Sequence, residues 1–184
     1  MIIKKVKLMK NGCLEVTYTD NEGNDINLKG ANTAHPDMKN AIKRLVPFFC
    51  ELTEQKESEK INWDDIECDA NIELLRRLDV HGVTISGSDA FVSVTITGNR
   101  TLNVTNRILN LNTPNVNLDA ETETYDRVIG LQECVDMICE EAKLYITEHK
   151  YQVVQTTFDF EGSEDPFGAD GAAGESGNLE KNAV

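Results

Sequence analysis

The chain has 184 residues, 40% of them hydrophobic, and a net charge of −14. This size suits one domain with a tail, and a body of about 155 residues buries roughly 70% of its unfolded surface without needing a disulfide or a structural metal. No apolar run of about 18 residues occurs and the N-terminus does not resemble a secretory signal, so we expect no membrane span and a location in the cytoplasm.

The charge is unevenly distributed. Residues 1–60 carry a net charge of +1, residues 61–160 a net charge of −10, and residues 161–184 a net charge of −5. Affinity for nucleic acid depends on Lys and Arg side chains that neutralise phosphates. The distribution therefore disfavours direct nucleic-acid binding and leaves only a local basic patch, around residues 4–10, open to it.

The first thirty residues predict an antiparallel meander of three strands. Asn11-Gly12 predicts a two-residue type I′ turn between the first two strands. Leu14, Val16 and Tyr18 alternate with polar residues, which is typical of a half-buried strand.

A helix is expected to begin near Pro36, since proline suits a first helical turn. Pro47 should kink or end this helix, because its ring removes the hydrogen bond to the carbonyl of Lys43. The apolar stripe comprises Met38, Ile42, Leu45, Phe49 and Leu52.

The middle of the chain predicts a second group of strands. Residues 61–69 are read as a strand with Ile61 and Trp63 on one face, and residues 71–80 as a short helix or an irregular connector. A hairpin should join residues 81–87 to 91–97, with the next turn at Gly98-Asn99. Pro114 should stop a further strand.

The last ordered element is predicted to be an amphipathic helix from Asp126 to about His149, with Thr124 or Asp126 as its cap. Its seam is expected to pack into the core. The seam comprises Val128, Leu131, Val135, Ile138, Ala142 and Tyr145.

These elements follow the order strands, helix, strands, helix. We predict an α+β fold with a largely antiparallel sheet and two main helices packed on one face. Residues 1–155 form the single domain in this interpretation, and residues 156–184 form an acidic tail rich in Gly, Ala and Ser.

The sequence offers little chemistry. It has no phosphate-binding glycine loop, nucleophile elbow or zinc-protease motif. The five cysteines form no Cys-x-x-Cys pair and are expected to be free thiols. Four acids that could hold a hard cation are more typical of a solvated loop: Asp64, Asp65, Glu67 and Asp69. We therefore expect a non-enzymatic protein with no cofactor and no metal.

Several short motifs resemble a family of small uncharacterised bacteriophage and prophage proteins over roughly residues 1–155. The resemblance implies a phage genome, the host cytoplasm and a place near replication and recombination functions. Phe48 stands where the family pattern has histidine, which argues against a catalytic group there. The matching residues are His35, Pro36 and Asp37, then Leu45 and Pro47, then Val80, Gly82 and Val83, and finally Leu111, Asn112 and Pro114.

The tail contains aromatic residues among acids, and this composition suits a basic, apolar-floored pocket on a partner protein. It is similar to the acidic tails of single-stranded-DNA-binding proteins, although 17 residues follow Phe167 and no terminal carboxylate stands beside it. A spacer, or a last strand in the sequence TTFDF, remains the alternative. The predicted partner-binding residues are Phe158, Asp159, Phe160, Glu164, Asp165 and Phe167.

Three functions fit these observations. The first is a phage accessory protein that binds phage or host proteins during genome replication or recombination through its acidic tail. The second is an anti-defence inhibitor whose acidic surface mimics DNA, and the third is a virion or assembly component. The sequence leaves the oligomeric state open, including a homo-oligomer.

Overall fold

A computed structural model describes residues 1–87, 91–119, 121 and 124–151 of the chain. The chain divides into a first unit, Met1–Val153, and the remaining residues Val154–Val184. The fold described below is that of the first unit.

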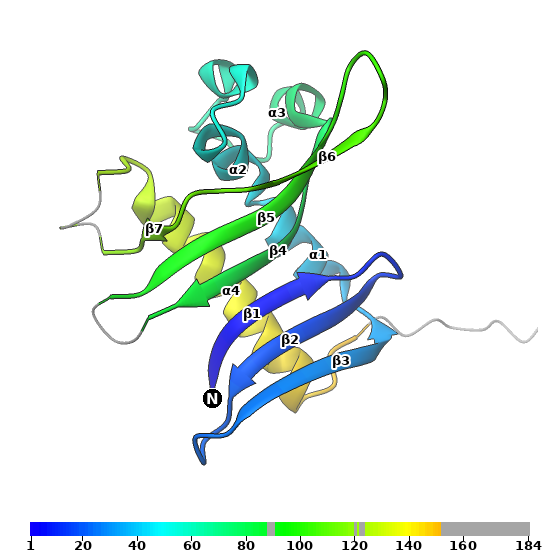
Figure 1. Ribbon diagram of the computed structural model, residues 1–184, viewed down its shortest axis with the longest axis vertical. Coiled ribbons are helices and arrows are strands. Elements are labelled where there is room, and N and C mark those ends of the chain that lie inside the picture. Colours follow the sequence, from blue (N-terminus) through cyan, green and yellow to red (C-terminus); the bar gives the residue numbers. More distant parts are fainter. Residues whose placement is uncertain (88–90, 120, 122–123, 152–184) are drawn as a thin grey trace, which may run out of the picture. The chain divides into compact units, whose positions relative to one another are not determined.

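Strands of the first unit form one sheet in which every pairing is antiparallel (Figure 1). The strand order is β3-β2-β1-β4-β5-β6, and the short β7 pairs with β5 beyond the end of β6. The strands are β1 (Ile2–Leu8), β2 (Cys13–Thr19), β3 (Asp25–Thr33), β4 (Leu78–Ser86), β5 (Ser93–Thr101), β6 (Ile108–Asn112) and β7 (Val116–Asn117). The predicted α+β fold with a largely antiparallel sheet is confirmed.

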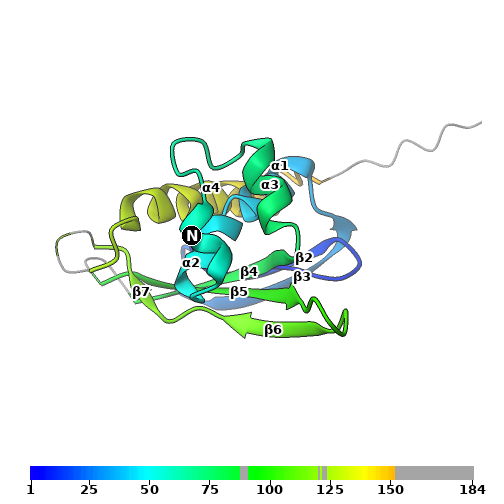
Figure 2. The ribbon, with the colours of Figure 1, turned by 90° about the horizontal axis from the view of Figure 1, so that it is seen from above.

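The helices lie together on one face of this sheet (Figure 2). They are α1 (Pro36–Lys43), α2 (Val46–Leu52), the short 3₁₀ helix η1 (Lys56–Lys60), α3 (Asp69–Leu75) and α4 (Val128–Thr147). The two main helices expected from the sequence correspond to α4 and to the pair α1 and α2.

Proline divides the first predicted helix as expected. The helix α1 ends at Lys43, and Pro47 lies in the first turn of α2, where its missing N–H costs no hydrogen bond. At the other end of α1, Nδ1 of His35 accepts a hydrogen bond from the Asp37 N–H at 3.3 Å.

The core lies between the sheet and the helices. All six residues of the α4 seam are buried, which confirms the predicted packing. The predicted cap of α4 is wrong: Arg127 occupies the N-cap position and makes no capping hydrogen bond. Its guanidinium instead lies 4.0 Å from the centre of the Trp63 ring and pairs with Glu51.

The β1–β2 turn differs from the prediction, because a type I′ turn needs positive φ at both central residues. Only Gly12 has positive φ, at +79°. The Met9 N–H donates to the Cys13 carbonyl at 2.8 Å, and Oδ1 of Asn11 accepts from the Cys13 N–H at 3.1 Å. This is the longer type of hairpin loop that carries one left-handed glycine.

Two further expectations in the middle of the chain are wrong. Residues 61–68 form a loop rather than a strand, with Asp69 already in α3, and β5 continues through Gly98-Asn99 instead of turning there. The β4–β5 hairpin is confirmed, with Val83 opposite Ile96. The strand before Pro114 is also confirmed as β6, and residues 71–75 belong to the short helix α3.

Candidate functional site

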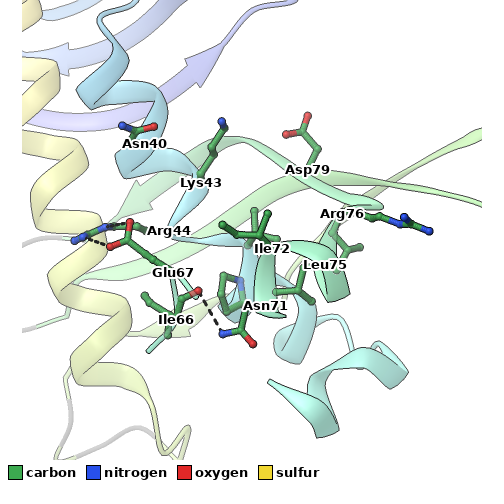
Figure 3. A pocket seen from close by; sticks show the side chains of 13 residues that line it. Asn40, Lys43, Arg44, Ile66, Glu67, Asn71, Ile72, Leu75, Arg76 and Asp79 are labelled. Atoms are coloured by element: carbon green, nitrogen blue, oxygen red, sulfur yellow. Dashed lines mark hydrogen bonds and ion pairs between the residues drawn. The ribbon is translucent and has the colours of Figure 1, made fainter. Parts of the chain in front are cut away.

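A groove of about 480 Å³ opens between α1, α3 and the loop that joins η1 to α3 (Figure 3). Its floor is apolar and is formed by Pro47, Ile66, Ile72, Leu75 and Leu78. Charged side chains line its rim. We refer to this hollow as the α1–α3 groove.

The floor of the α1–α3 groove includes an isoleucine that the fold leaves in solvent. Ile72 is 62% exposed, whereas Leu75, one turn later on α3, is only 5% exposed and packs into the core. Full burial of an isoleucine side chain is worth about 1.5–3 kcal/mol. The exposed side chain is therefore available to a partner that would cover it.

One buried asparagine holds the wall of the groove. Asn71 is 2% exposed. Its Oδ1 accepts from the Asn62 N–H at 2.9 Å, and its Nδ2 donates to the carbonyl oxygens of Asn62 at 2.8 Å and Asp65 at 3.1 Å. The Asn71 side chain thus bonds backbone groups of this loop that have no neighbouring strand to pair with. It also bonds the carbonyl of Ile66 and so fixes the position of that residue (Figure 3).

An ion pair closes one end of the groove. The guanidinium of Arg44 donates two hydrogen bonds to the Glu67 carboxylate, one of them from Nε to Oε1 at 2.9 Å, and one to Sδ of Met137 at 3.3 Å. The hydrogen bond lowers the pKa of Glu67 and raises that of Arg44. Both groups stay charged at neutral pH, so this end of the groove has little net charge.

The opposite rim carries a cation that is available for binding. Lys43 is exposed at the end of α1, and its ammonium forms no hydrogen bond or ion pair with any residue that the structure describes. Asp79 at the start of β4 lies at the same mouth (Figure 3). A ligand that enters here therefore meets an ammonium, a carboxylate and an apolar floor.

Three of the five thiols are poorly suited to nucleophilic chemistry. Burial raises the pKa of Cys50 to about 12 and the pKa of Cys134 and Cys139 to about 11. At neutral pH these groups are protonated, and the thiolate is the reactive form. All five cysteines are free, as expected from the sequence.

The predicted tail residues lie outside the described residues. This applies to Phe158, Asp159, Phe160, Glu164, Asp165 and Phe167.

The predicted acidic cluster separates into two settings. Glu67 is paired with Arg44, as described above. Asp64 lines another hollow, beside α4, together with Asp126 and Glu133. Arg44 and Arg127 line this second hollow too, so it contains both carboxylates and guanidinium groups.

Asparagines of β5 and β6 lie on the open face of the sheet. Asn99 of β5 lies opposite Asn110 of β6, and Thr97 lies opposite Asn112. These residues alternate with Gly98 and Leu111, which face the helices. The asparagines therefore form the solvated side of the strands.

Lysines on the same face do not form a continuous cationic groove. Lys7 lies opposite Glu15, which is in turn opposite Lys29. Lys5 contacts the same carboxylate at 3.4 Å. Desolvation acts to raise the pKa of Glu15, but the hydrogen bond from Asn27 and the charges of Lys5 and Lys29 outweigh it, so the pKa is lowered. The basic patch left open by the sequence is thus interrupted by charge pairing.

The groove residues Lys43, Asn71 and Ile72 were not predicted as functional. The one available signal was Asn71, a polar residue on the side of a short helix that also carries Leu74 and Leu75.

Comparison with known protein families, with curated proteins and with solved structures finds no match. Among the described residues, no three His, Cys, Asp or Glu side chains are grouped as ligands of a metal ion would be. No helix in this part of the chain has both the length and the apolar character needed to cross a membrane.

Proposed function

We propose that the protein is a non-enzymatic phage accessory protein that binds other proteins during genome replication or recombination. In this proposal the α1–α3 groove receives a segment of a partner, and residues 158–167 of the tail form a second, recruiting segment. The observation that carries the proposal is the exposure of Ile72 on the floor of a preformed groove. An apolar floor with a charged rim is typical of sites that bind short peptide segments.

The rim indicates what the partner segment should contain. Ile72 and Ile66 would cover an aliphatic or aromatic anchor, and Lys43 would pair with a carboxylate close to that anchor. Arg44 would contribute little, because its donors are already engaged by Glu67 and Met137. The proposed ligand is therefore an acidic segment with one large apolar side chain.

The test compares partners captured from phage-infected cells by the tagged full chain and by three variants. Ile72→Asp places a charge on the groove floor. Ile129→Asp is the matched control, because Ile129 is 63% exposed and lies outside the groove on α4. The third variant ends at residue 155 and lacks the tail.

We expect Ile72→Asp to lose a protein that Ile129→Asp retains, and the truncated variant to lose a protein that needs the tail. The binding of each such protein is then measured with purified components. If Ile72→Asp and Ile129→Asp capture the same proteins in the same amounts, the groove is not a docking site. An unchanged set of partners after truncation removes the role of the tail.

The DNA-mimic alternative has one observation in its favour. Asp64, Asp126 and Glu133 line one hollow beside α4, so three carboxylates lie near one another there, together with the guanidinium groups of Arg44 and Arg127. A mimic would inhibit a DNA-binding nuclease, and the triple variant Asp64→Asn, Asp126→Asn, Glu133→Gln would lose this inhibition. Equal inhibition by the wild type and the triple variant would rule out these acids as the mimic.

A further inference from the structure

The border strand β6 combines an open edge with exposed apolar side chains. Ile108 is 65% exposed and Leu109 is 44% exposed, and Val104 in the adjoining hairpin loop is 94% exposed. In the described part of the chain, β6 is the last strand of the order and pairs with β5 alone (Figure 1). Open edges of this kind are usually protected by lysine, proline or a bulge, and β6 has none of these between Ile108 and Asn112.

The hydrogen bonds of the β5–β6 hairpin show which backbone groups are turned outward. The Leu102 N–H donates to the Arg107 carbonyl at 2.9 Å, and the Thr113 N–H donates to the Ile96 carbonyl at 3.0 Å. Along an antiparallel strand, the backbone N–H and C=O groups of successive residues point alternately to one side and to the other. The groups of Leu109 and Leu111 therefore bond toward β5. The N–H and C=O groups of the alternate residues, Ile108, Asn110 and Asn112, therefore point away from the sheet.

The opposite border, β3, is protected. Asp25 of β3 accepts a hydrogen bond from Lys4 at 2.6 Å, and Lys29 places a second charge on the strand. An isolated bridge also joins Ala34, just after β3, to Tyr151. The two borders of the sheet thus differ in charge, and only β6 is uncharged along its length.

We propose that β6 is a dimerisation edge, on which β6 of a second copy pairs antiparallel about a two-fold axis at Asn110. In this register Asn110 lies opposite its own equivalent and Ile108 lies opposite Asn112 of the second copy. All three outward residues then both donate and accept a backbone hydrogen bond. This inference uses no residue of the α1–α3 groove and does not depend on the proposed function.

A second copy fits this edge for two reasons. The sequence Leu-Asn-Leu at residues 109–111 is symmetric about Asn110, so Leu109 meets Leu111 of the second copy on the helical side and both gain apolar cover. The chain carries a net charge of −14, so two copies repel at most surfaces. The uncharged β6 is a place where two such chains can approach closely.

Sedimentation velocity of the full chain, from micromolar to millimolar concentration, tests the proposal. The mass should rise from the 20.5 kDa of one chain to twice that value. Asn110→Pro removes an outward N–H that the single chain does not use, and it should keep the variant monomeric. The matched control is Asn27→Pro at the β3 border. The backbone N–H of Asn27 also points away from the sheet. The Asp20 N–H bonds the Asn24 carbonyl, and from this pair onward every second residue of β3 bonds toward β2, which leaves Asn27 among the outward residues.

Circular dichroism establishes that both proline variants are folded. If Asn110→Pro does not fold, Leu109→Lys serves in its place, because a lysine on an open edge prevents pairing while the backbone ladder is unchanged. We expect the wild type and Asn27→Pro to form dimers. Asn110→Pro or Leu109→Lys should remain monomeric. A wild type that stays monomeric, or a β6 variant that dimerises as the wild type does, overturns the proposal.

Discussion

Gly98 of β5 lies directly against the ring of Phe49 from α2. A Cβ atom at position 98 would come within 2.7 Å of Cζ of Phe49 and 2.5 Å of the backbone oxygen of Asp79. Phe49 is fully buried, so its ring has no space into which to move. The absence of a side chain at Gly98 thus allows α2 to pack closely on the sheet. This packing also positions Pro47, which lies in the first turn of α2 and forms part of the groove floor.

We predict that Gly98→Ala destabilises the fold by roughly 1–3 kcal/mol, the usual cost of forcing an extra methyl group into a packed core. Urea denaturation followed by circular dichroism measures the change. Gly130→Ala is the control, since its Cβ would lie 3.4 Å from Phe48 at an ordinary contact distance and within a helix that favours alanine. Equal stability of the Gly98→Ala variant and the wild type would contradict the close packing described here.

Removal of the Asn71 side chain should loosen the groove wall. Asn71→Ala leaves the Asn62 N–H and the Asp65 carbonyl without their partner, at a cost of about 1–3 kcal/mol for each buried group that stays unsatisfied. Hydrogen exchange should show faster exchange at the Asn62 amide, with less change in the β1–β2 hairpin. Asn62→Ala is the control, because it keeps the backbone groups that Asn71 binds. Unchanged exchange at residue 62 in Asn71→Ala would show that this asparagine does not hold the loop.

The half-buried pair of Arg100 and Glu57 should make stability depend on pH. Nη1 and Nη2 of Arg100 donate hydrogen bonds to the Glu57 carboxylate at 2.9 and 2.6 Å, and this lowers the pKa of Glu57 in the folded state. A depressed carboxyl pKa contributes stability that is present above the unfolded-state pKa of about 4.3 and is lost as the pH falls through the folded-state value.

We therefore expect Glu57→Gln to cost about 1–2 kcal/mol at pH 7, and the difference from the wild type to shrink as the pH falls below about 4. Urea denaturation at a series of pH values measures both quantities. Glu73→Gln is the control, because Glu73 and its partner Arg76 are both highly exposed and their pair should contribute little. A difference that stays constant with pH would mean that ionisation of Glu57 is not linked to folding.

Periodicity in the sequence predicted the elements that bury a regular face. The α4 seam, the meander and the break at Pro47 follow from local patterns, because each depends on spacing or on the chemistry of one residue. The position of Gly98 could not be predicted in this way. A glycine followed by asparagine usually signals a turn, and only the approach of Phe49, about fifty residues earlier in the chain, requires glycine within the strand.

The groove could not be predicted for the same reason. Ile72 and Lys43 are ordinary residues in their own helices, and only the packing of α3 beside α1 brings them to one hollow. The loop at residues 61–68 resembles a strand in composition, but the backbone N–H and carbonyl of Asn62 bond the side chain of Asn71 rather than a neighbouring strand. Hydrogen bonds from a single asparagine side chain produce no periodic pattern in the sequence.

Selection of short peptides from a random display library on the immobilised full chain tests the docking role of the α1–α3 groove most directly, since it requires no known partner. We predict that the enriched peptides share a large apolar residue near an acidic one. They should bind Ile129→Asp as they bind the wild type and lose at least about tenfold in affinity, about 1.4 kcal/mol, for Ile72→Asp. Enriched peptides that bind both variants equally, or no enrichment at all, would contradict the account.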